Sequence, residues 1–153
     1  MLFRIGILLM VLIFTGCAGT QTLVNEKYSA SNDDKFKIDI LNTANATEAG
    51  LNVFKSQLST YDSVLKIGNP NPNRIVIIEF TNYYVRHGAT RALAGIMAGS
   101  DNVTTVTTVK DATTGETLGS VKHVTKNPTA VVGINLLLKG HADKIVKYLL
   151  SQQ

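Results

Sequence analysis

The sequence has a single cysteine, no tryptophan and no run of basic residues, and each absence excludes a class of protein. Cys17 lies near the N-terminus, so the rest of the chain has no thiol for an internal disulfide or for nucleophilic attack. The net charge of +4 is spread along the chain, which argues against nucleic-acid binding. We therefore expect a domain stabilised by packing alone, with no nucleic-acid partner.

The N-terminus contains one positive charge followed by a short apolar run. Arg4 precedes the apolar residues 5–14, and small residues then lead up to Cys17. A charged start, a short apolar core and a small-residue exit are typical of a secretory signal peptide. The run is well below the roughly 20 apolar residues that a membrane-spanning helix needs. The pattern predicts that residues 1–16 are a signal peptide.

The last residues of this segment, Phe14-Thr15-Gly16-Cys17, resemble the lipobox of bacterial lipoproteins. In that family the cysteine carries a thioether-linked diacylglycerol and an acylated amine, and it becomes the mature N-terminus. Two or more acyl chains hold a soluble domain stably on a membrane, whereas one binds only marginally. The resemblance therefore implies a lipid on Cys17 that tethers the chain to a membrane. A secreted protein with an incidental cysteine is the alternative.

The residues after the cysteine bear on location and on where the domain begins. In lipoproteins of two-membrane bacteria, an aspartate after the cysteine resembles an inner-membrane retention signal, so Ala18 points to the outer membrane. Residues 17–34 comprise the cysteine that the lipobox resemblance implies is lipidated and a stretch rich in polar and small residues, which predicts a polar tether with a weak strand over 22–28. We expect a single periplasmic α+β domain over residues 35–153.

Four later segments have strand patterns. Residues 35–41 alternate apolar and charged side chains, as in a strand with one buried face. Residues 74–85 begin with a continuous apolar run, which is typical of a strand in the middle of a sheet. Residues 102–110 and 117–125 are rich in β-branched side chains and flank a turn in which Gly115 can take a positive φ, so they predict a hairpin.

Two segments have helical periodicity. One begins near a cap at Asn45 or Thr47 and runs to about Lys66, and the other covers about residues 135–150. Their expected core stripes are Leu51, Phe54, Leu58, Tyr61 and Leu65, and Leu138, Ala142, Ile145 and Leu149. The order strand, helix, strand, loop, hairpin, helix predicts an α+β fold, a roughly four-stranded mixed sheet with two helices packed on one face. The first strand–helix–strand unit predicts two parallel strands.

Several stretches resemble a family of small bacterial lipoproteins that is known only as a domain of unknown function. They are YYV at 83–85, RALAGIMAGSD at 91–101, DATTGETLG at 111–119 and HADKIV at 141–146. The resemblance covers most of the mature chain and implies a fold and an envelope location without a known activity. A more distant similarity, at the level of fold, is to periplasmic lipoprotein domains that assist secretion or envelope assembly.

The segment RHGATRALAGIMAGS at residues 86–100 is the candidate site outside the anchor. One interpretation is a loop tucked under the sheet. The functional interpretation is a partner-docking or membrane-facing loop, with Ile96 and Met97 as apolar contacts and Arg86 and Arg91 as flanking cations.

Motifs for catalysis and metal binding are missing from the sequence. His87, His123 and His141 lie in no recognised nucleophile, metal or acid–base motif. We expect His123 on a strand surface, and His141 and Asp143, two apart on a helix, on different faces. We therefore predict no catalytic residue, no metal, no cofactor and no enzymatic activity.

These observations together favour an outer-membrane lipoprotein with a non-catalytic periplasmic domain that binds a protein partner or supports envelope assembly. A small-ligand or glycan-binding lipoprotein is the alternative, and an envelope hydrolase is a third.

Overall fold

The computed structural model describes residues 19–86, 99–128 and 132–151. The described elements follow one another as β1 (Gly19–Glu26), β2 (Phe36–Asn42), α1 (Glu48–Ser59), β3 (Arg74–Tyr84), β4 (Asp101–Asp111), β5 (Thr117–Asn127) and α3 (Ile134–Leu149). Within the described ranges, no helix combines the length and the apolar character needed to span a membrane.

The strands form one five-stranded mixed sheet in the order β1-β5-β4-β3-β2. Strands β2 and β3 are parallel, and the other neighbours are antiparallel. The parallel pair is the expected one, because α1 carries the chain from one strand back to the start of the next. The predicted α+β mixed sheet is confirmed, with one strand more than the expected four.

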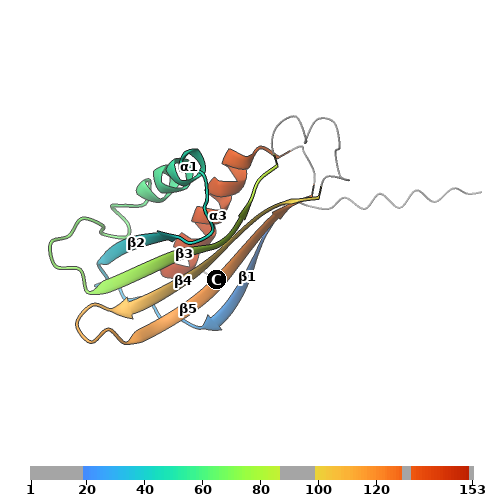
Figure 1. The fold of residues 1–153 in the computed structure, drawn as a ribbon. Coiled ribbons are helices and arrows are strands. Elements are labelled where there is room, and N and C mark those ends of the chain that lie inside the picture. Colours follow the sequence, from blue (N-terminus) through green and yellow to red (C-terminus); the bar gives the residue numbers. More distant parts are fainter. Residues whose placement is uncertain (1–18, 87–98, 129–131, 152–153) are drawn as a thin grey trace, which may run out of the picture.

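Both described helices cover the same face of the sheet (Figure 1). The four stripe residues of α3 are all buried, and in α1 Phe54 stands edge-on to Phe80 of β3 with ring centroids 5.0 Å apart. Edge-to-face aromatic pairs add stability beyond the area they bury. The predicted face of α3 is therefore confirmed, and that of α1 is confirmed at Phe54 and Leu58, while Leu51 is only partly buried. The opposite face of the sheet is covered by none of the described elements.

Helix α1 is shorter than the sequence predicts. Thr47 caps its start by accepting a hydrogen bond from the Gly50 N–H over 3.2 Å, but the helix ends at Ser59 rather than near Lys66. The hydroxyls of Ser59 and Thr60 donate to carbonyls of the last turn, a competition that favours a helix end over its continuation.

The folded domain begins much earlier than expected, at Gly19. Strand β1 pairs with β5 along its whole length, and Tyr28 and Asp34 beyond it are buried. The prediction of a polar tether over residues 17–34 is therefore wrong. The sequence does not reveal this strand because β1 lies at the edge of the sheet and its side chains are exposed except for Thr20, which is partly buried. Backbone pairing holds the strand in place, so its sequence shows no alternation of apolar and polar residues.

Candidate functional site

The candidate site lies at one end of the sheet, where four strands begin or end side by side. Gly19 of β1 pairs with Lys126 of β5, Lys126 with Asn102 of β4, and Asn102 with Tyr84 of β3. We call this end of the sheet the Gly19 end. The chain leaves β3 and re-enters β4 at this end, so the predicted docking segment is inserted there.

A buried ion pair closes the sheet at the Gly19 end. The Arg86 Nε lies 3.1 Å from Asp101 Oδ1, and both side chains are excluded from solvent. The guanidinium also donates to the Gly99 carbonyl over 2.6 Å and to the Asn127 carbonyl over 3.0 Å. Asn127 in turn donates to Asp101 over 3.1 Å. The cluster fastens the end of β3, the start of β4 and the end of β5 to one another.

This position differs from the one predicted for Arg86. The side chain is excluded from solvent and hydrogen-bonded to backbone and carboxylate partners, so it positions strand ends and does not line a surface. A single sequence cannot distinguish these roles, because the partner Asp101 is 15 residues away along the chain. The other predicted residues, Cys17, Arg91, Ile96 and Met97, lie outside the described residues.

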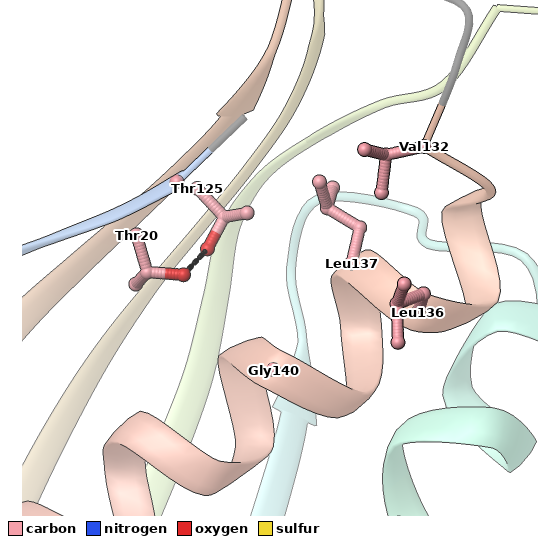
Figure 2. A pocket seen from close by; sticks show the side chains of 7 residues that line it. Thr20, Thr125, Val132, Leu136, Leu137 and Gly140 are labelled. Atoms are coloured by element: carbon pink, nitrogen blue, oxygen red, sulfur yellow. Dashed lines mark hydrogen bonds between the residues drawn. The ribbon is translucent and has the colours of Figure 1, made fainter. Parts of the chain in front are cut away.

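A largely apolar pocket of about 260 Å³ opens beside this cluster, between the start of β1 and the first turns of α3. Figure 2 shows Thr20 and Thr125 on the strand side of the pocket and Leu136 and Leu137 on the helix side. The pocket is lined by Gly19, Thr20, Thr125, Val132, Leu136, Leu137 and Gly140. No sequence pattern marks this pocket, because its walls come from opposite ends of the chain.

A chain of hydrogen bonds leads from this pocket into the core. The hydroxyls of Thr20 and Thr125 lie 2.6 Å apart, and the Thr125 hydroxyl is 2.6 Å from His141 Nδ1. The other ring nitrogen of His141 lies 2.8 Å from the Thr105 hydroxyl. Both nitrogens of this buried ring are therefore satisfied by neutral hydroxyls, as a buried polar side chain requires.

A second buried histidine packs against the first. His123 is fully buried, which corrects the prediction of a place on the strand surface, and its ring centroid is 5.9 Å from that of His141. Its ring nitrogens have no partner in hydrogen-bonding geometry among the described residues. Burial, aided by the Lys144 charge, lowers the pKa of His123 to about 4, and burial together with His123 lowers the pKa of His141 to about 3. Both rings are neutral at physiological pH.

Neither of the two buried histidines titrates near neutral pH. A general base works best with a pKa near the operating pH, and the pKa of about 3 at His141 is far below it. Across residues 19–86, 99–128 and 132–151, no three His, Cys, Asp or Glu side chains are grouped as a metal site. What the Gly19 end presents is an apolar hollow beside neutral hydroxyls.

The fold is similar to that of two solved structures of the PelC dodecamer from Paraburkholderia phytofirmans. One, of a leucine-to-methionine variant, has a TM-score of 0.63 at 13% identity and covers 88% of this chain and 100% of its own. The other has a TM-score of 0.59 at 11% identity and covers 87% and 97%. A candidate lipoprotein from Caulobacter crescentus CB15 matches with 17% identity over 74% of this chain and 89% of its own, but its TM-score of 0.41 supports no conclusion. No curated protein matches the sequence significantly.

These similarities define the class as a small α+β domain with helices on one face of a mixed sheet. The model of a domain of unknown function, DUF4410, matches residues 31–133, about two thirds of the chain. The chain belongs to this family. The resemblance to a family known only as a domain of unknown function is thereby confirmed.

Proposed function

We propose that this chain is a lipid-anchored outer-membrane protein whose non-catalytic periplasmic domain binds protein partners, including further copies of itself. One observation carries the anchor. The lipobox cysteine, Cys17, stands two residues before Gly19, where the first strand of the sheet begins. The charged start, the apolar core and the small-residue exit of a secretory signal peptide end at this cysteine, so the signal segment leads directly into the first strand.

Metabolic labelling tests the anchor directly. Radiolabelled palmitate should enter the wild-type chain and should not enter the Cys17→Ser variant, because the thioether needs the sulfur. Equal labelling of both proteins would refute a lipid at this residue. The outer-membrane location rests on Ala18 after the cysteine, and membrane fractionation of wild type against Ala18→Asp tests it. The aspartate variant should move to the inner membrane.

Partner binding has support from the uncovered parts of the sheet. Strands β1 and β2 are the two edges, and Leu23 and Leu41 on them are 49% and 46% exposed. Exposed edge strands are templates for pairing with another chain. When one edge of a subunit meets the other edge of the next, the contact is head-to-tail and can close into a ring. The PelC structures of the same fold are dodecamers.

Crosslinking between single thiols tests this self-association. Leu23→Cys places a thiol on β1 and Leu41→Cys places one on β2, in a mature chain with no other free thiol. An equal mixture of the two lipidated variants, treated with a short bismaleimide, should give crosslinked pairs, whereas each variant alone should give none. A monomer by light scattering and no pairs in the mixture would contradict self-association.

The absence of catalysis remains part of the proposal. Its support is the low pKa of His141 and its enclosure by threonine hydroxyls. A histidine acting as general base in an envelope hydrolase would work best with a pKa near neutral pH. Turnover of an envelope substrate that Thr125→Val abolishes would overturn this part of the proposal.

A small-ligand or glycan-binding role is the second candidate, because the pocket sets hydroxyls beside apolar side chains. Its volume of about 260 Å³ lies below the roughly 300–1,000 Å³ of usual ligand sites. Saturable binding of one ligand to the wild type, abolished by Leu137→Trp, would favour this role over partner binding.

A further inference from the structure

The Gly19 end is the part of the domain nearest to the proposed anchor. Consecutive Cα atoms are about 3.8 Å apart, so the Cα of Cys17 lies within about 7.6 Å of the Cα of Gly19. An anchored cysteine sits at the headgroup level of the bilayer, where interfacial segments are buried by roughly 5–10 Å. Gly19 and its neighbours across the sheet must then lie in or directly on the headgroup layer.

The exposed side chains at this end suit such a layer. Leu136, in the first turn of α3 and on the rim of the pocket with Gly19, is 66% exposed. Tyr84 is 53% exposed and ends β3 in the row of Gly19. Lys126, which pairs with Gly19, is exposed as well. Leucine, tyrosine and lysine combine apolar insertion, an amphipathic ring and attraction to phosphate groups.

The first turn of α3 contributes to the same fit. It contains no acidic residue, and the residue before it, Gly133, makes no side-chain cap. A helix N-terminus whose first turn has no acidic side chain is a favourable place for a phosphate group.

We propose that the Gly19 end of the domain rests on the lipid surface, with Leu136 and Tyr84 in the headgroup layer, as a second membrane contact beside the anchor. The inference rests on the proposed lipid at Cys17. It fixes the direction of the domain, since β3 carries the chain over about 33 Å from its start to Tyr84. The opposite end of the sheet then points away from the membrane.

A matched pair of residues allows this orientation to be measured. Val64 is 55% exposed, similar to Leu136, and lies at the opposite end, where the next residue accepts a hydrogen bond from Phe36 at the start of β2. The chain has no tryptophan, so a single introduced indole is a unique fluorophore. Leu136→Trp, Tyr84→Trp and the control Val64→Trp each report on one position.

The lipidated variants are reconstituted into phosphatidylethanolamine and phosphatidylglycerol vesicles with or without brominated acyl chains. With bromine, Leu136→Trp should lose most of its emission and Tyr84→Trp a large part, while Val64→Trp should keep all of it. Circular dichroism identical to the wild type shows that each variant is folded. Tyr84→Trp gives a second probe of the same end if Leu136→Trp misfolds.

The outcomes separate this inference from the anchor on which it depends. Flotation of the protein with vesicles reports on the lipid, and its loss would overturn the proposed function. Flotation without quenching at residues 84 and 136 would overturn the inference alone. Equal quenching at residues 64 and 136 would also overturn it, because the domain would then lie flat on the membrane.

Discussion

Arg86 shows how one buried charge organises the end of this sheet. Its guanidinium reaches the Asp101 carboxylate and the carbonyls of Gly99 and Asn127, so three strand ends share one cation. Transfer of two charges into a protein interior is costly, and their attraction compensates only when geometry and hydrogen bonds are good. Removal of one partner then lowers the free energy of unfolding far more than the loss of a surface ion pair does.

Asp101→Asn tests this statement. The amide keeps the size of the side chain but removes the negative charge 3.1 Å from the Arg86 Nε, and we expect a loss of about 3–5 kcal/mol in the free energy of unfolding. Urea unfolding followed by circular dichroism measures it. Asp39→Asn is the control, because the Lys37–Asp39 pair at 3.4 Å is exposed and should contribute at most about 1 kcal/mol. Equal effects of the two substitutions would show that the buried Arg86–Asp101 pair contributes no more to stability than an exposed pair.

At the scale of elements, β4, β5 and α3 meet around two histidines that stay neutral. His123 on β5 and His141 on α3 face one another, and β4 supplies the Thr105 hydroxyl. An unfolded histidine titrates near pH 6.5, whereas burial lowers the pKa of His123 to about 4 and that of His141 to about 3. Between pH 6.5 and 4 the unfolded chain therefore binds more protons than the folded one, and acid favours unfolding.

His123→Leu should remove about half of the pH dependence that the two buried histidines give to the free energy of unfolding. Each buried histidine contributes a slope of about 1.4 kcal/mol per pH unit in this window, and His123 has no hydrogen-bond partner to lose among the described side chains. Urea unfolding of variant and wild type at several values from pH 6.5 to pH 4.5 gives both slopes. Parallel slopes would show that His123 binds protons equally in the folded and unfolded states, which would contradict its lowered pKa.

The elements also show how far sequence patterns reach. The stripe Leu138, Ala142, Ile145 and Leu149 predicts α3 well, because a helix against a sheet needs one apolar face. The edge strand β1 could not be predicted fully, because its backbone pairing leaves no periodic trace. The pocket could not be predicted either, since Thr20 and Leu136 meet only after the sheet has formed.

At the scale of the whole molecule, the early start of β1 has the largest consequence. With the sheet beginning at Gly19, an anchored Cys17 allows the domain almost no freedom to move away from the membrane. Strands β1 and β2 are the edges of the sheet. In the proposed orientation these edges face sideways, where further copies would pair, and the Gly19 end faces the lipid. The chain belongs to a family that is a domain of unknown function, and the proposed orientation on the membrane is a property of this domain that experiments can measure.

Intact mass spectrometry of the protein purified from native membranes tests the central claim most directly. The account predicts a mature chain that starts at Cys17 and carries the added mass of a diacylglycerol and an amide-linked acyl chain. An unacylated chain, or one that begins at any other residue, would contradict it.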